Sequence, residues 1–219
     1  MSGEAAHHLG RVLRAEPGQQ CELSDGTTVW LGRIDVVERD RVEFELLERL
    51  GGREPTLRTT LLLSIVKFDS FEWALEKATE LGVRTIVPLA AARSEKALLH
   101  AAEKRTVRWN KILLESAQQS RRVSLPEIRD VEKPAKAFQH ANGFKIILSE
   151  RAEAQALKAV LPTAASQSAL AIGPEGGWTD EELAAAEAAG FRQASLGHLI
   201  LRTETAVISA LSNLNYALG

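Results

Sequence analysis

The chain has 219 residues, of which 45% are hydrophobic, 26% charged and 5% aromatic. This apolar content can fill a core and excludes a fully disordered protein. A single cysteine, Cys21, excludes an internal disulfide framework, and no apolar run approaches the length of a membrane span. The start of the chain has no basic, apolar leader, so we expect a cytoplasmic protein with no membrane association.

The formal net charge of −2 conceals an uneven distribution along the chain. Residues 1–57 carry −4, residues 58–140 carry +5 and residues 141–219 carry −3. A positive middle segment is compatible with a local contact to an anion such as a nucleic acid. The solvated faces of charged helices produce the same pattern, and composition leaves both interpretations open.

The first fifty residues predict a small β domain. Val42, Phe44 and Leu46 alternate with glutamates, which is the period of a half-buried strand. A short helix at 8–13 precedes the strands, and Gly51–Pro55 reads as a linker and domain boundary. The predicted strands are 20–24, 28–37 and 41–48.

The rest of the chain alternates between strand and helix patterns. A capping box at Thr179–Glu182 begins a helix that ends before Gly190. Apolar residues at helical spacing predict helices over 71–81, 109–117 and 207–214. The predicted strands are 59–66, 85–89, 144–149, 169–172 and 193–196. Several of them are continuous apolar runs, so the pattern predicts an α/β fold with a parallel sheet.

Several familiar chemistries are absent. No phosphate-binding loop, no dinucleotide-binding glycine motif and no nucleophile elbow occurs in the sequence. The five histidines have no metal-ligand spacing, so we expect no metal. Cys21 lies in a predicted strand, where a buried, small apolar role is expected.

Two glycine-containing loops follow predicted strands near the C-terminus. The first, at 172–177, contains three glycines, a proline and Glu175 ahead of a capped helix. In open α/β sheets, ligands bind at the carboxyl ends of the strands. The second, at 195–205, surrounds Gly197 with leucine and isoleucine side chains that could flank a flat ring. There Thr203 is the predicted N-cap of a helix.

Arg202 and Glu204, in the second loop, each allow two interpretations. Arg202 is either a functional cation or a surface charge. Glu204 is either a functional carboxylate or a residue that complements the dipole of the following helix.

Several segments together resemble one known family. They are EKATELGVRTIVPL, RWNKILLESAQQSRRVSLPEI, IGPEGGWTDEE and LGHLILRTETA, and HHLGRVLRAEPGQQCELSDG near the start of the chain. The sequence is similar to the RsmE-type methyltransferases of 16S ribosomal RNA, which belong to the SPOUT superfamily. The resemblance implies a PUA-like β-barrel RNA-binding domain at 1–55, whose first strand is missing or replaced here. It also implies a SPOUT methyltransferase domain at 56–219 with a C-terminal trefoil knot.

The resemblance further implies that S-adenosylmethionine (SAM) binds at the knot. Its adenine is expected against residues 196–201, and its methionine part near Gly173 and Glu175. The expected SAM-binding residues are Leu148, Ser149, Glu150, Gly173, Pro174, Glu175, Gly176, Leu196, Gly197, Leu199, Ile200, Leu201 and Thr205.

The implied reaction is methylation of a uridine at N3 in 16S ribosomal RNA of the small subunit. A carboxylate near the methyl group could remove the N3 proton, and an arginine could stabilise the negative charge that spreads to the ring oxygens. Glu204 is the candidate base or orienting group, and Arg202 is the candidate for stabilising the charge. The alternatives are a SPOUT methyltransferase with another RNA target, or a non-catalytic RNA-binding or ribosome-assembly protein.

Basic side chains provide a candidate RNA surface. The expected contacts are Arg11, Arg14, Arg93, Lys104, Arg108, Lys111, Arg121 and Arg122. A homodimer is also implied by the resemblance. Val207, Leu211 and Leu214 fit an apolar contact helix for it, but an intramolecular core would give the same pattern.

Overall fold

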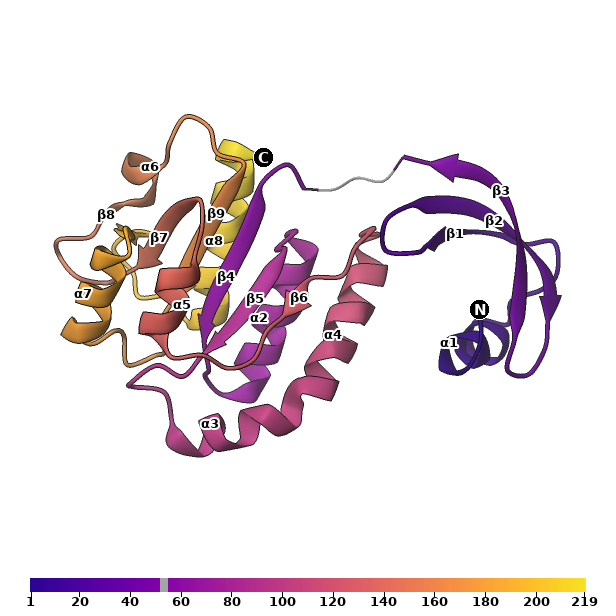
Figure 1. Ribbon diagram of the computed structural model, residues 1–219, viewed down its shortest axis with the longest axis horizontal. Coiled ribbons are helices and arrows are strands. Elements are labelled where there is room, and N and C mark those ends of the chain that lie inside the picture. The colour runs from indigo at the N-terminus through magenta and orange to yellow at the C-terminus, as the bar shows by residue number, and fades with distance from the viewer. Residues whose placement is uncertain (52–54) are drawn as a thin grey trace. The chain divides into compact units, whose positions relative to one another are not determined.

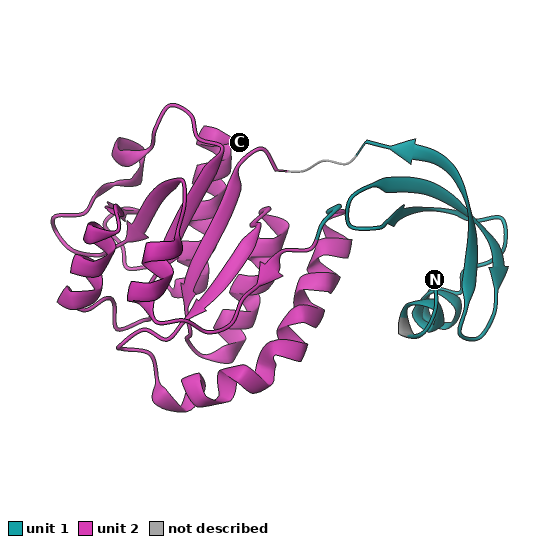
Figure 2. Ribbon diagram, in the orientation of Figure 1, with its two compact units in different colours: residues 1–54, 122–124 teal, residues 55–121, 125–219 magenta. Residues whose placement is uncertain are grey.

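The computed structural model describes residues 1–51 and 55–219. The chain divides into two compact units (Figure 2). The first comprises residues 1–54 and 122–124, and the second comprises residues 55–121 and 125–219. The predicted linker Gly51–Pro55 coincides with this division, and its residues 52–54 lie outside the described part of the chain.

The first unit contains a three-stranded antiparallel sheet in the order β1-β2-β3. Its strands are β1 (Gln20–Ser24), β2 (Val29–Val37) and β3 (Val42–Leu50). The predicted helix begins four residues early, as α1 (Glu4–His7) followed by the π-helix η1 (His8–Val12). In the described residues the sheet is open, because β1 and β3 each pair only with β2; an isolated bridge joins Ser2 to Arg41.

The alternation predicted for β3 holds at its start and fails at Leu46. Val42 is fully buried and Phe44 half-buried, whereas Leu46 is 53% exposed. The small core of this unit joins Ala6 to Ile34 and Val42, so the helical segment covers the sheet only at this end. Among the described residues, the core of this unit includes no residue of β3 beyond Phe44, so the rest of the strand is left uncovered. Register shifts in the pairing of β3 with β2 also introduce bulges.

The second unit is built on a seven-stranded sheet in the order β6-β5-β4-β9-β7-β10-β8, and every neighbouring pair in it is parallel. Leu61, Leu62 and Leu63 are all fully buried in its central strand, as expected where helices cover both faces. The strands are β4 (Arg58–Ser64), β5 (Thr85–Leu89), β6 (Glu127–Ile128), β7 (Phe144–Leu148), β8 (Gln155–Ala156), β9 (Gln167–Ile172) and β10 (Arg192–Ser195).

Helices cover both faces of this sheet (Figure 1). Apolar residues of α2, α4 and α8 pack with Leu61 and Leu63 on one face, and those of α5 and α7 pack with Leu62 on the other. The helices are α2 (Phe68–Glu80), α3 (Lys96–Ala102), the 3-10 helix η2 (Glu103–Arg105), α4 (Thr106–Gln119), α5 (Pro134–His140), α6 (Leu157–Val160), α7 (Asp180–Ala188) and α8 (Thr203–Leu218). The predicted α/β class, with a parallel sheet after a small β unit, is confirmed.

The apolar stripe of α8 belongs to the core of its own chain. Val207, Leu211 and Leu214 are at most 1% exposed and lie in the cluster that also contains residues of α2 and β4. Of the two interpretations left open by the sequence, the intramolecular core is therefore correct for these residues. Within the described residues, no helix combines the length and the apolar character needed to cross a membrane.

Candidate functional site at the carboxyl edge of the sheet

The segments expected to bind a ligand meet at one edge of the sheet. The neighbouring parallel strands β9, β7 and β10 end at Ile172, Leu148 and Ser195, so the loops that follow them start side by side. The Ser149 amide donates to the carbonyl of Ala194 at 3.0 Å. These contacts bring together the three segments that contain the residues expected to bind the ligand.

The loop after β9 is shaped by a tryptophan. A Cβ on Gly173 would lie 3.0 Å from the indole ring of Trp178, a close contact that a larger residue could make only if the ring shifted by a few tenths of an ångström. Trp178 in turn donates from Nε1 to the carbonyl of Leu148 at 3.0 Å, which ties this loop to the end of β7. Gly177 adopts a positive φ of 69° and its amide donates to Pro174 O, closing a tight turn.

The capping box that begins α7 is confirmed. The Thr179 hydroxyl accepts from the Glu182 amide at 3.2 Å, and the Glu182 Oε2 atom accepts from the Thr179 amide at 2.9 Å. This fixes the point at which the glycine loop ends. Glu175, within the loop, is exposed, whereas Pro174 is buried.

The loop after β10 presents an incomplete apolar wall. Leu196 and Leu201 pack against the core, whereas Leu199 is 82% exposed and Ile200 is 77% exposed. The Ser195 hydroxyl donates to Gly197 O at 2.9 Å and accepts from the Gly197 amide at 3.2 Å, which holds the bend. Two of the four side chains expected to flank an aromatic ring therefore project from the surface.

The sequence predicted Thr203 as the N-cap of α8, and this prediction is wrong. Arg202 occupies that position with extended backbone angles and makes no side-chain cap. Thr203 is the first helical residue, and its hydroxyl donates to the carbonyl of Gly173 at 3.5 Å. The hydroxyl thus joins the two glycine loops, and it reaches across to the first loop rather than to its own helix.

The two candidate catalytic residues lie in different environments. Arg202 is exposed, as is Thr205, whereas Glu204 is only 5% exposed. In the described part of the chain the Glu204 side chain forms no hydrogen bond or ion pair, and its oxygens are not among the buried side-chain oxygens that lack a partner, so the carboxylate still reaches solvent. A carboxylate that is accessible and unpaired beside the joined loops is consistent with a group that meets a ligand.

The segment after β7 is joined to the start of α7 by an ion pair. Ser149 and Glu150 follow β7, and Glu150 is exposed. Arg151 pairs with Asp180 at the start of α7, which connects this wall to the helix after the glycine loop. The Arg151 guanidinium, through its hydrogen bond and its charge, lowers the pKa of the Asp180 carboxyl from its ordinary value.

The expected RNA-binding cations have varied surroundings. Arg108 donates from Nε to the buried carboxylate of Glu72 at 2.6 Å, and Arg105 donates to the same carboxylate at 3.0 Å. Lys111 lies 3.8 Å from Glu115, and Lys104 is exposed. Of these three expected RNA contacts, Lys104 in η2 and Arg108 and Lys111 in α4, two therefore lie next to carboxylates.

The other expected cations are spread over both units. Arg11 and Arg14 are exposed in the first unit, and Arg14 has a positive φ of 50°. Arg121 is exposed with a φ of 53°, and Arg122 is partly buried and groups with the first unit. Arg93 donates from Nη1 to the carbonyl of Gly176 at 2.6 Å, which places it against the glycine loop.

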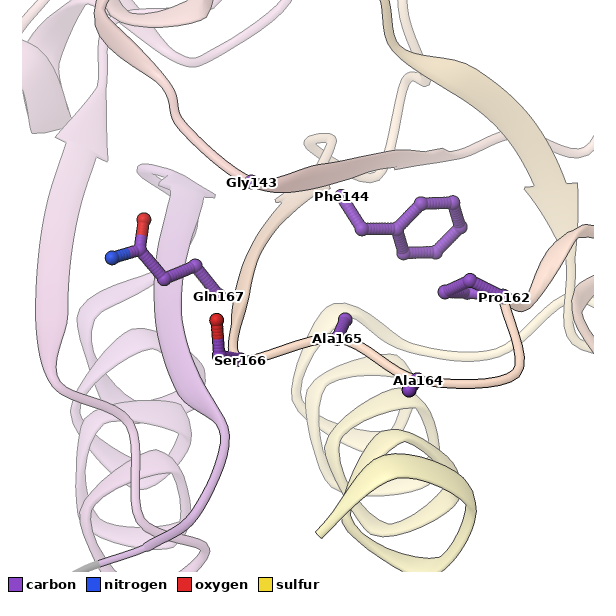
Figure 3. Close-up of a pocket in the computed structure, with 7 residues that line it drawn as sticks. All are labelled: Gly143, Phe144, Pro162, Ala164, Ala165, Ser166 and Gln167. Carbon is purple, nitrogen blue, oxygen red and sulfur yellow. The ribbon is translucent and has the colours of Figure 1, made fainter.

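One cavity of about 330 Å³ opens at the opposite edge of the sheet (Figure 3). Phe144 and Gln167, which begin β7 and β9, contribute to its lining. The lining contains no acidic or basic side chain; it consists of Gly143, Phe144, Pro162, Ala164, Ala165, Ser166 and Gln167. Because all the loops joined above lie at the carboxyl ends of the strands, we place the candidate site there and not in this cavity.

Sequence reasoning did not identify three contacts that shape the site. These are the Trp178 indole on Leu148, the Thr203 hydroxyl on Gly173, and the Glu182 carboxylate, which also accepts from the Ala92 amide at 2.8 Å. A tryptophan next to a Gly-Gly pair was an available signal, because a buried indole N–H needs an acceptor. Nothing in the sequence indicated the partner of Glu182, which lies ninety residues away.

The described residues contain no cluster of three or more histidine, cysteine, aspartate or glutamate side chains able to hold a metal ion. Cys21 is half-buried, and burial raises the pKa of its thiol. It is thus less buried than the sequence predicted.

The fold and the site define a class of protein: an α/β domain with a glycine-loop site at its carboxyl edge, together with a small β unit. A family model described as an RNA methyltransferase domain matches residues 53–215, and one described as an RNA methyltransferase PUA domain matches residues 2–47. The chain belongs to this RNA methyltransferase family, and the resemblance seen in its motifs is confirmed.

Named relatives are similar over nearly the whole chain. Ribosomal RNA small subunit methyltransferase E of Bacillus subtilis is 33% identical, with 99% of this chain and 89% of the relative covered. The protein of the same name from Neisseria gonorrhoeae, solved bound to S-adenosyl methionine, is 32% identical with a TM-score of 0.91, covering 100% of this chain and 91% of that one. A methyltransferase from Legionella pneumophila in complex with SAM is 34% identical with a TM-score of 0.90, at the same coverage.

Proposed function

We propose that this protein transfers the methyl group of SAM to N3 of a uridine in 16S ribosomal RNA of the small subunit. The observation that carries the proposal is that the two glycine loops begin together at the carboxyl ends of the neighbouring strands β9, β7 and β10, where the Thr203 hydroxyl lies 3.5 Å from Gly173 O. The names of the relatives support the substrate, and two similar structures that contain SAM support the donor.

The residues at this edge fit a sulfonium nucleoside. Gly173 exposes backbone where a side chain would crowd Trp178, and the partly buried Leu196 and Leu201 offer an apolar surface for a flat ring. When bound, SAM supplies a methyl group made electrophilic by its positively charged sulfur. The residues proposed to hold it are those expected from the sequence: Leu148–Glu150, Gly173–Gly176, Leu196, Gly197, Leu199–Leu201 and Thr205. The trefoil knot expected over these loops is part of the same proposal.

Arg202 and Glu204 are the proposed catalytic residues. Uridine N3 carries a proton and becomes a nucleophile only when that proton leaves. The Glu204 carboxylate accepts the proton, and its lack of another side-chain partner in the described residues leaves it available. The exposed Arg202 guanidinium stabilises the negative charge that develops on the neighbouring ring oxygens.

RNA contacts are proposed from both units. Residues 1–55 form an RNA-binding domain and residues 56–219 the methyltransferase domain, as their family matches suggest. Phosphates are contacted by Arg11, Arg14, Lys104, Arg108, Lys111, Arg121 and Arg122. Uridine N3 is paired in a duplex, so the target base is presented unpaired or flipped out. We further propose that the protein acts in the cytoplasm, where ribosomes assemble, and that it is a homodimer.

The test is to incubate the protein with isotope-labelled SAM and undermethylated small subunits, and to locate the modified base by mass spectrometry. The proposal expects label at N3 of one uridine in 16S RNA. Label in transfer RNA would support another RNA target. RNA binding without any label would support a non-catalytic protein.

A further inference from the structure

A short segment after β5 is hydrogen-bonded both to the glycine loop and to the first turn of α7. The Ala92 amide donates to Glu182 Oε1 at 2.8 Å, and the Arg93 guanidinium donates from Nη1 to Gly176 O at 2.6 Å. The next residue, Ser94, is 7% exposed and donates to Ile65 O at 2.7 Å, just beyond the end of β4. The segment 92–94, called the clasp below, thus connects β4 to the loop at 173–177.

Glu182 performs two tasks with its two oxygens. Oε2 accepts from the Thr179 amide within the capping box, and Oε1 accepts from Ala92 in the clasp. The first contact fixes where α7 begins, and the second fixes α7 to the segment after β5. A capping box needs only the first contact, so the second serves the position of the loop.

Arg93 is fitted closely to the glycine loop. A Cβ on Gly176 would lie 3.2 Å from the Cβ of Arg93, so the glycine allows the arginine to lie alongside it. The same cation contributes to the low pKa of Asp180 and of Glu181 at the start of α7, after larger local hydrogen bonds. The guanidinium is thus already hydrogen-bonded to the loop, and its charge acts on the acidic start of the helix without a direct contact.

We infer that Arg93 and Glu182 are positioning residues, which hold the loop 173–177 in the conformation that receives the methyl donor, and that Arg93 is not an RNA contact. This inference rests on the proposed function and revises the role expected for Arg93 from the sequence. The chemistry is a charge-assisted hydrogen bond to a loop carbonyl on one side and a bridging carboxylate on the other.

The test compares Arg93→Met with the wild-type protein in two binding measurements. Methionine keeps an unbranched side chain but donates no hydrogen bond. We expect SAM affinity by calorimetry to fall about tenfold, as for loss of a hydrogen bond to a charged group, while the salt dependence of RNA affinity stays unchanged. In turnover assays the KM for SAM rises, whereas kcat at saturating SAM and the KM for RNA stay near wild type.

Glu182→Gln tests the other side of the clasp. Glutamine replaces one of the two oxygens with an NH2 donor, which would face either the Thr179 amide or the Ala92 amide, so one of the two contacts is lost. We expect a three- to tenfold loss of SAM affinity, again without a change in RNA affinity. The matched controls are Glu187→Gln, an exposed position on the same helix, and Arg129→Met, an arginine paired with Glu127 away from the loop. Both controls should bind SAM like the wild type.

Two results would overturn the inference. One is a SAM affinity in both variants equal to that of the controls. The other is a salt slope for RNA binding that falls by about 0.7 to 0.9 in Arg93→Met with SAM affinity intact, since that is the change for one lost phosphate contact. If the wild-type protein itself binds no SAM, the proposed function fails instead, so the two failures are distinguishable.

Discussion

At the scale of single residues, the carboxyl edge combines one buried acid with exposed arginines. Glu204 is 5% exposed without a partner in the described residues, and Arg202 is exposed two residues earlier. This pairing fits removal of a proton inside the site and stabilisation of charge at its mouth. The residue types were evident in the sequence, but the difference in burial was not, because it depends on how α8 packs against α2 and β9.

Substituting Glu204 or Arg202 should lower the rate of methyl transfer without weakening the binding of SAM. We expect Glu204→Gln to lower kcat by about 10² to 10⁴, the usual contribution of a general base. Arg202→Ala should lower it by about 10². SAM affinity by calorimetry should stay within a few fold of wild type in both. Near-normal turnover with intact SAM binding would remove the assigned roles.

The ion pair between Arg151 and Asp180 predicts a measurable pH effect. Because the Arg151 guanidinium favours the charged carboxylate, the pKa of Asp180 should lie below its ordinary value of 3.8, and Arg151→Ala should raise it towards that value while the charge of Arg93 still lowers it. A lowered carboxyl pKa stabilises the fold above the ordinary value, and this contribution is lost as the pH falls through the lowered one. Carboxyl NMR titration of both proteins measures the shift. Equal pKa values in the two proteins would show that the pair does not form in solution.

At the scale of elements, long periodic segments could be predicted and short ones could not. The stripes over 71–81 and 109–117 correspond to α2 and α4, because a helix that buries one face must repeat its apolar residues every three or four positions. The short α3, α5 and α6 and the two-residue strands β6 and β8 were not predicted. Elements this short carry too few residues to show a period, and tertiary contacts decide them.

The residues of the site could likewise be predicted only where the signal is local in the sequence. The glycines at 173, 176 and 177 and the capping box could be recognised locally. The role of Thr203 could not, because its hydroxyl could satisfy either its own helix or Gly173, thirty residues away. The sequence pattern predicted a contact within its own helix. In the structure the hydroxyl contacts Gly173 instead, because the two loops lie close together.

One buried carboxylate of α2 bridges to both η2 and α4. Glu72 holds Arg105 and Arg108, and Arg105 also lies 4.3 Å above the ring of Phe68. We expect Glu72→Ala to lower the free energy of unfolding by roughly 1–3 kcal/mol, less than for a fully buried pair because both arginines are partly exposed. Urea unfolding measures this, with the more exposed Glu76→Ala as a control. Equal losses in the two variants would contradict the assignment.

At the scale of the whole molecule, the proposed homodimer needs a contact surface other than the stripe of α8. That stripe is buried within the chain, whereas Leu199 and Ile200 project from the loop after β10. Exposed side chains of this size often mark an interface. If they do so here, the second copy also completes the apolar wall of the donor site.

Sedimentation of the wild-type protein and of the double variant Leu199→Asp, Ile200→Asp tests this surface. We expect a dimer for the wild type and a monomer for the variant, because charged groups are costly in an apolar contact. Circular dichroism should show an unchanged fold, since both positions are exposed. A wild-type monomer at high concentration, or a variant that remains dimeric, would contradict the proposal.

Calorimetric titration with SAM tests the account most directly, because every role proposed above requires a donor at the joined loops. The account predicts saturable binding by the wild-type protein, and none by a folded Gly173→Leu variant, whose side chain enters the space between the loop and Trp178. If the wild type gives no heat of binding, the protein does not bind SAM. If the two proteins bind SAM with equal affinity, the donor site lies elsewhere. Either result would contradict the account.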